Sequence, residues 1–260
     1  MSGETMATHS GNLTAPEILQ GHLPFDVQAR LPGTGPLDPA DWILVDDAFA
    51  AQMAEREALL ARCPEKVLAC EASARPAAEE LLAEVLRALE ARPDYLVGQA
   101  EVTRPDGVTV PLAAAADPDP AAPLALLGRL VQQDFCLMEK RGEEHVLTGA
   151  VLCFPASWTL AEKIHQPLLR IHVPVPVYDE MLARRVQRLF DGIQPGRPLW
   201  RANRLRYALP TLHAPVSETA PPAERHPDDG PYIRSERQSL WRLPETRAVV
   251  FGIHTFMLRA

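Results

Sequence analysis

The sequence lacks the short motifs that mark the commonest cofactor-binding and catalytic sites. Its 260 residues contain no GxGxxG segment, Walker loop, GxSxG serine motif or HExxH zinc motif. These patterns bind nucleotide phosphates, activate a serine or hold a zinc ion. We therefore expect no nucleotide site in the chain, and the electrons for any redox reaction would have to come from another protein.

The chain is also poor in cysteine, in positive charge and in long apolar runs. Its four cysteines form no CxxC pair, which disfavours a zinc ribbon or an iron–sulfur centre and favours buried thiols in a reducing compartment. The net charge of −8 argues against nucleic-acid binding, which needs a basic surface. Residues 110–128 come closest to a membrane span, but Asp117 and Asp119 interrupt them. We expect a cytoplasmic protein with no nucleic-acid or membrane partner.

The pattern of apolar residues indicates one domain after a polar leader. Residues 1–22 are polar and aperiodic, so we expect a mobile N-terminal tail, and residues 23–260 are expected to form a single domain. The spacing of apolar residues predicts helices over 46–62, 75–92, 123–133, 159–165 and 178–193, and strands over 133–138, 145–154, 232–243 and 246–258. Because there is no regular βαβ alternation, this order favours an α+β fold around a mostly antiparallel sheet.

Residues 147–178 hold two histidines in apolar surroundings. Pro167 lies between His165 and His172 and ends a continuous helix, so the two are not a paired metal site on one helix face. His172 has the more apolar neighbours, in the run Leu168–Val173. A single neutral imidazole among apolar side chains is the usual protein ligand of haem iron. The alternative is a core histidine bonded to a backbone carbonyl group.

A second pattern is the row of charged residues in the predicted strand 232–243. Alternation along a strand puts Arg234, Glu236 and Gln238 on one face and Arg237 on the other. Such a row can line a cavity and orient a small polar substrate. The alternative is a strand face exposed to water.

Three further positions are weaker candidates. Arg201 and Asn203 could bind carboxylate or phosphate groups, or could fix a loop through bonds to the backbone. His213 is a possible second iron ligand. His254 lies in a strand that is apolar on both faces, which predicts a central strand and a core histidine.

Taken together, the segments resemble a known family. The similar segments are Leu23-Pro24-Phe25-Asp26, Leu37-Asp38-Pro39 with Trp42, Gln133–Met138, Cys153–Trp158, Glu162-Lys163, Pro167-Leu168, Ile171–Pro176, Trp200–Asn203, Leu212-His213, Arg234–Gln238, Arg242-Leu243-Pro244 and the last strand. They run in the family's order from about residue 23 to 258. On these residues the chain resembles the haem-dependent oxidative N-demethylase alpha-subunit-like family, formerly a domain of unknown function.

The resemblance implies a PAS-like fold, in which a curved antiparallel sheet with flanking helices holds haem b. It implies oxygen-dependent oxidation of a small amine, with electrons from reductase subunits that carry FMN and an iron–sulfur centre. By position, it assigns the iron to His172, and Arg201, Asn203 and Gln238 are further candidate cofactor contacts. His165 stands where relatives are expected to carry a small residue such as glycine; it is also a candidate cofactor contact and the alternative ligand of the iron. Oxygen handling or substrate orientation falls to Arg234, Glu236 and Arg237.

Two other functions remain open at this level. A PAS-like protein could bind haem and sense a gas without turnover, because one fold hosts many functions. The domain could also be an interaction module that binds no cofactor.

Overall fold

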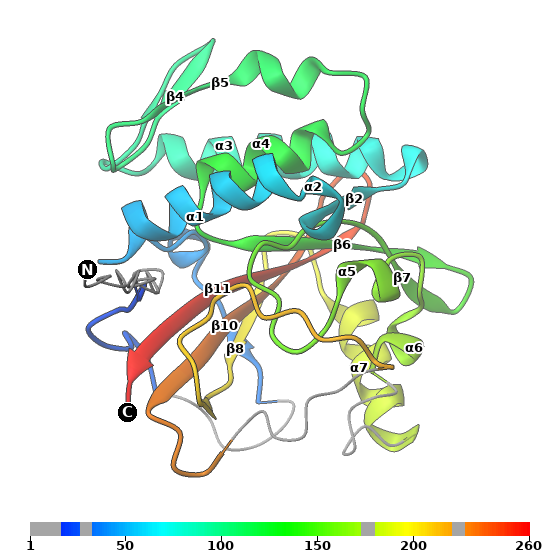
Figure 1. Ribbon diagram of the computed structural model, residues 1–260. Coiled ribbons are helices and arrows are strands. Elements are labelled where there is room, and N and C mark those ends of the chain that lie inside the picture. Colours follow the sequence, from blue (N-terminus) through cyan, green and yellow to red (C-terminus); the bar gives the residue numbers. More distant parts are fainter. Residues whose placement is uncertain (1–16, 27–32, 173–179, 220–226) are drawn as a thin grey trace, which may run out of the picture.

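A large antiparallel sheet forms the centre of the computed structural model (Figure 1). The structure describes residues 17–26, 33–172, 180–219 and 227–260. Within them the main sheet has eight strands in the order β1-β8-β10-β11-β6-β7-β2, with β9 paired to β10. The strands are β1 (Gly35–Pro36), β2 (Leu68–Cys70), β6 (Asp134–Arg141), β7 (Glu144–Val151), β8 (Leu199–Ala202), β9 (Leu205–Tyr207), β10 (Tyr232–Arg242) and β11 (Val249–Arg259).

The two longest strands, β10 and β11, pair over their whole length, from Tyr232 opposite Arg259 to Arg242 opposite Val249. Strands β6 and β7 form a hairpin whose turn contains Gly142 at φ 62°, a conformation that glycine adopts without steric cost. A register shift lies between Leu137 and Met138 in this hairpin. The centre of the sheet is therefore built from two local strand pairs, β10 with β11 and β6 with β7, which the long-range pairing of β11 with β6 joins.

One face of the main sheet is covered by three helices, α1 (Phe49–Arg62), α3 (Arg75–Glu90) and α4 (Ala122–Leu130) (Figure 1). We call it the α1 face. Its core includes Leu81 and Leu127 from the helices and Phe135 and Trp241 from the sheet, all in one apolar cluster. The large apolar area removed from water here is the main favourable term for this half of the fold.

The opposite face carries the short helices α5 (Leu160–Lys163) and α6 (Leu168–His172) and the longer α7 (Glu180–Gly192). We call it the α7 face. A second apolar cluster joins Leu168 of α6 and Phe190 of α7 to Leu240 and Ile253 of the sheet.

Arg242 of β10 attaches the end of α7 to this face. Its guanidinium donates to the carbonyl oxygens of Phe190 and Ile193, the latter at 2.6 Å. A cation at the carboxyl end of a helix satisfies carbonyl groups that have no partner in the helix. The apolar cluster and this anchor together fix α7 against β10.

The remaining elements are small. A separate sheet of β3 (Leu96–Val97), β4 (Glu101–Thr103) and β5 (Thr109–Pro111) lies beyond α3 and α4 (Figure 1). The chain also forms α2 (Pro64–Val67) and the 3-10 turns η1 (Pro39–Asp41), η2 (Ala72–Ala74) and η3 (Leu112–Ala116).

The α+β class, the antiparallel sheet and its flanking helices are as predicted. Helices α1, α3, α4 and α7 and strands β6, β7, β10 and β11 lie where the sequence predicts them, within a few residues. The PAS-like character, the tail over 1–22 and the single domain over 23–260 stay predictions, and residues 1–16 lie outside the described part. No described helix is long and apolar enough to cross a membrane.

Candidate functional site

Strand β10 carries the predicted charged row, and its two faces are separated as predicted. Leu240 belongs to the apolar cluster of the α7 face, and Trp241 to that of the α1 face. Side chains alternate along the strand, so Arg234, Glu236 and Gln238 share the α7 face with Leu240. Arg237 lies on the α1 face. The structure therefore brings Arg234 and Glu236 together and leaves Arg237 on the other side of the sheet.

Glu236 is the centre of a hydrogen-bond network on the α7 face. The Asn203 side chain accepts from the Glu236 backbone N–H at 2.9 Å and donates to its Oε2 at 3.2 Å. The Gln238 amide donates to the same Oε2 at 3.0 Å, and the Asn203 backbone N–H donates to the Glu236 carbonyl at 3.1 Å. The Glu236 side chain is only 10 % exposed. Two neutral amides thus fix its position.

Arg234 is buried beside Glu236 and binds two loops. Its guanidinium donates to the carbonyl oxygens of Leu212 at 2.9 Å and Phe154 at 2.6 Å. Its Nε lies 3.6 Å from Glu236 Oε1, and the group stands over the Tyr207 ring at 5.9 Å. Arg234 therefore holds the segments after β7 and β9 against the sheet and neutralises the buried carboxylate.

Arg201 differs from the other arginines of this region. It pairs directly with Gln238 in the ladder between β8 and β10, so it lies on the α7 face. Its side chain is half-buried, and it has no hydrogen-bond or ion-pair partner among the residues that the structure describes. Burial lowers the pKa of its guanidinium, and the charge of Glu236 opposes this. A half-buried cation without a partner is unusual, because losing its water shell is costly.

Arg237, on the α1 face, has its partners within the protein. Its guanidinium donates to the carbonyl oxygens of Asp41 at 2.7 Å and Trp42 at 3.3 Å and stands 5.6 Å above the Trp200 ring. Burial lowers its pKa as well. These contacts fit a residue that ties the N-terminal segment to the sheet.

The two candidate iron ligands lie apart from β10 in the sequence. His172 is the last residue of α6, and its side chain falls outside the part of the chain that the structure describes, as do residues 173–179. His165 lies between α5 and α6, so the predicted break at Pro167 is confirmed.

The His165 side chain is on the surface. Its Nδ1 lies 2.7 Å from Glu71 Oε1, and its side chain is 59 % exposed. Bonds from Arg141 and, to a smaller extent, His165 lower the pKa of Glu71 to about 2. Glu71 directly follows β2, at the opposite edge of the sheet from β8, so the structure does not bring His165 to the Glu236 network.

The apolar cluster of the α7 face connects α6 with the polar network. It includes Leu168, with Ile171 packed against it, next to the position of His172. It also includes Leu240 and Ile253, whose neighbours on β10 and β8 are Gln238 and Arg201. An apolar wall that ends in a few polar groups is the usual composition of a small-molecule site.

Sequence reasoning missed Thr255 and Tyr207. Thr255 pairs with Glu236 on β11, and its buried hydroxyl has no partner among the described residues. Tyr207 lies under the Arg234 guanidinium. Alternation on β11 could have indicated Thr255, whereas β9 is too short to show a period.

Two other candidate histidines, His254 and His213, have partners within the protein. His254 is fully buried on the central strand β11, with Nε2 2.8 Å from Asp46 Oδ2, so the predicted core histidine is confirmed. His213 Nδ1 lies 2.8 Å from the Cys153 carbonyl oxygen, a contact found in both structural and metal-binding histidines, so its assignment as a second iron ligand stays a prediction.

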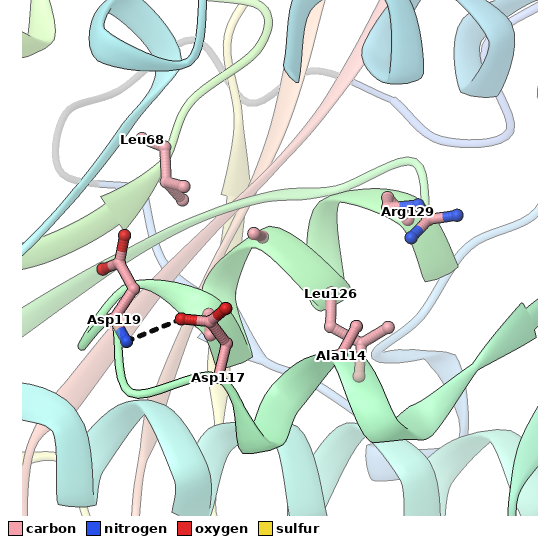
Figure 2. Close-up of a pocket in the computed structure, with 8 residues that line it drawn as sticks. Leu68, Ala114, Asp117, Asp119, Leu126 and Arg129 are labelled. Atoms are coloured by element: carbon pink, nitrogen blue, oxygen red, sulfur yellow. Dashed lines mark hydrogen bonds between the residues drawn. The ribbon is translucent and has the colours of Figure 1, made fainter. Parts of the chain in front are cut away.

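A surface concavity lies elsewhere, on the α4 side of the molecule. Figure 2 shows its lining, with Asp117, Asp119 and Leu68 on one side, Arg129 on the other, and Ala114 and Leu126 between them. The Asp119 backbone N–H donates to Asp117 Oδ1 at 2.9 Å. None of the predicted site residues lines it, so we do not assign the function to it.

Comparison with known families agrees with these observations. Residues 33–260 match the family described as "Haem-dependent oxidative N-demethylase, alpha subunit-like". The chain belongs to this family. The matched region contains every described element from β1 to β11, and with it the Glu236 network.

The residues on the α7 face of this family member are compatible with haem binding. Among the described residues, no three His, Cys, Asp or Glu side chains gather to bind a bare metal ion. Haem iron needs only one or two protein ligands, because the porphyrin supplies the other four. The cluster around Leu168, Leu240 and Ile253 offers apolar walls, and Arg201, for which the described part of the chain supplies no partner, suits a carboxylate.

Proposed function

We propose that the chain is the haem-binding, oxygen-activating subunit of an oxidoreductase that demethylates a small amine. The observation that carries the proposal is that two charged residues, Arg201 and Glu236, lie at the edge of an apolar cluster that extends to α6. The chain that contains them belongs to this family. The cofactor is haem b, with His172 as its proximal ligand. When bound, it supplies the one-electron and oxygen chemistry that protein side chains lack.

The reaction balances with an external electron donor. A secondary N-methyl amine, O2, two electrons and two protons give the primary amine, formaldehyde and water. The lack of a nucleotide motif and of a CxxC pair favours an external electron donor. The resemblance to the family implies that this donor is a set of partner reductase subunits that carry FMN and an iron–sulfur centre.

The residues of the α7 face bind the substrate, hold the binding groups in position and exclude water. The Glu236 carboxylate receives the ammonium group of the substrate, and Asn203 and Gln238 hold that carboxylate in place. Arg234 fixes the two loops over the site. The apolar cluster excludes water, which strengthens every charge interaction inside. Arg201 remains available to bind a carboxylate, and a haem propionate is one such group.

The test is oxygen consumption by the haem-loaded protein with a chemical reductant and N-methyl amines. We expect amine-dependent oxygen uptake and release of one formaldehyde per amine consumed. A protein that binds oxygen but releases no formaldehyde with any amine would instead be a haem or gas sensor, and the proposal would be wrong.

A further inference from the structure

We infer that the amine substrate carries its own carboxylate, which Arg201 binds while Glu236 receives the ammonium group. The inference rests on the proposed function and narrows its substrate class to N-methyl amino acids. It follows from the charges, the spacing and the hydrogen bonds of the α7 face.

The charges of the described residues in this region do not cancel. Arg234 Nε and Glu236 Oε1, 3.6 Å apart, form one ion pair. Arg201 adds a second cation on the same face, with no ion-pair partner among the described residues. The region therefore carries one net positive charge. A protonated alkylamine bound at Glu236 leaves the charge of Arg201 unbalanced, whereas the carboxylate of a zwitterion balances it.

Glu236 is not a direct partner of Arg201 in the structure. Its Oε2 accepts from Asn203 and Gln238, whereas its Oε1, 3.6 Å from Arg234 Nε, accepts no hydrogen bond from a described residue and can receive an ammonium group. A half-buried guanidinium needs an acceptor to offset the loss of its water shell, and a carboxylate matches its planar fork with two parallel hydrogen bonds. Arg201, whose guanidinium needs an anion, thus lies beside Glu236, whose carboxylate is positioned to bind a cation.

The spacing fits the two ends of one small molecule. Arg201 lies directly opposite Gln238, so Glu236 is its diagonal neighbour on the same face. Diagonal neighbours on adjacent antiparallel strands are about 7–8 Å apart at their backbones, within reach of long side chains. In an N-methyl amino acid one carbon atom separates the ammonium from the carboxylate, so both groups can be bound at once.

A haem propionate could supply the same chemistry, and the experiment separates the two sources. The probes are sarcosine and its neutral amide, sarcosinamide, which have the same ammonium and nearly the same shape. Each is titrated into haem-loaded wild type, Arg201→Gln and Arg201→Lys, with the Soret shift and calorimetry as readouts. Arg204→Gln, an exposed position nearby on the chain, is the matched control. Haem content and the free energy of unfolding are measured for each protein.

We expect wild type to bind sarcosine about 10- to 100-fold more tightly than sarcosinamide, as a charge-assisted hydrogen bond contributes about 1.5–3 kcal/mol. Arg201→Gln should remove this preference with haem content unchanged, Arg201→Lys should keep part of it, and Arg204→Gln all of it. Equal binding of the two probes by wild type overturns the inference and leaves the proposed function standing. If Arg201→Gln loses haem but still prefers sarcosine to sarcosinamide, the inference is also overturned, because Arg201 then binds a haem propionate. A wild type that binds no haem contradicts the proposed function itself.

Discussion

The α1 face and the α7 face of the main sheet both hold buried arginines that bind backbone carbonyl groups, and the α7 face adds Arg201, which differs from them. On the α1 face, Arg56 is fully buried and donates to Asp134 at 2.6 Å and to the carbonyl oxygens of Gly128, Gln132 and Gln133. On the α7 face, Arg201 is half-buried and has no partner among the described residues. Satisfied arginines stabilise a fold, whereas an arginine left without a partner in a partly buried place is free to bind a ligand.

The largest effect is expected on the α1 face. Arg56→Ala removes the cationic partner of the buried Asp134 carboxylate, leaving it only backbone N–H donors, and frees three carbonyl groups. We expect the free energy of unfolding to fall by about 3–5 kcal/mol, because the uncompensated charge remains in the core. Urea denaturation measures it. Arg62→Ala, in an exposed pair 3.9 Å long on the same helix, is the control and should cost well under 1 kcal/mol. Similar losses in the two variants would contradict the comparison.

Glu236→Gln tests the α7 face directly. The substitution keeps the shape but removes the negative charge, and we expect amine affinity to fall about 10- to 100-fold. Arg237→Gln, one residue away on the α1 face, should lower stability through its lost bonds to residues 41 and 42 and leave amine affinity unchanged. Amine titrations and urea denaturation of both variants measure this. If Arg237→Gln weakened amine binding as much, the two faces would not be functionally distinct.

The pH dependence of stability should reveal His145 of β7. This imidazole is fully buried beside α7, with Gln187 at 2.9 Å and the Phe190 ring at 5.4 Å. Burial lowers its pKa in the folded state, although Asp191 and Gln187 oppose the shift. Below about pH 6.5 the His145 imidazole therefore takes up a proton in the unfolded chain but stays neutral in the folded chain. The free energy of unfolding consequently falls as the pH drops through this range.

Denaturation between pH 8 and pH 5 measures this, with His145→Gln as the comparison. The difference between the two proteins should grow in favour of the variant as the pH falls. Glu71 and Asp46 do not interfere, because their lowered pKa values put their effects in more acidic solution. A difference that is constant with pH would mean that burial does not keep His145 neutral.

The smallest effect is expected at His165. Its φ of 66° is in the left-handed region, where glycine has no steric cost, and its ion pair with Glu71 is on the surface. In His165→Gly the relief of strain and the loss of the pair should nearly offset each other, with a change within about 0.5–1 kcal/mol. Haem content should stay the same, and its loss would restore His165 as a cofactor residue.

The alternation of side chains along strands predicted which residues of β10 share a face of the sheet. It placed Arg234 and Glu236 on one face of β10 and Arg237 on the other, because an 11-residue strand shows its period clearly. The strong periods of α1, α3 and α7 also predicted their positions. Strands of two or three residues, such as β3 and β9, and the five-residue α6 are too short to show a period, so the sequence did not indicate them.

The partners within the site could not be predicted in the same way. Asn203 and Glu236 are 33 residues apart, and Arg56 and Asp134 are 78 apart. Nothing in the local pattern tells a satisfied arginine from an unsatisfied one. Only the pairing of β8 with β10 reveals that Arg201 lies opposite Gln238, with Glu236 as the next residue of β10 on the same face.

The most direct test of the account is the absorption spectrum of the purified, haem-supplemented protein and of its His172→Ala variant. The account predicts a Soret band in wild type and in His165→Gly that is lost or shifted in His172→Ala, because the axial ligand sets the spectrum of the iron. A colourless wild type, or an identical spectrum in His172→Ala, would contradict it.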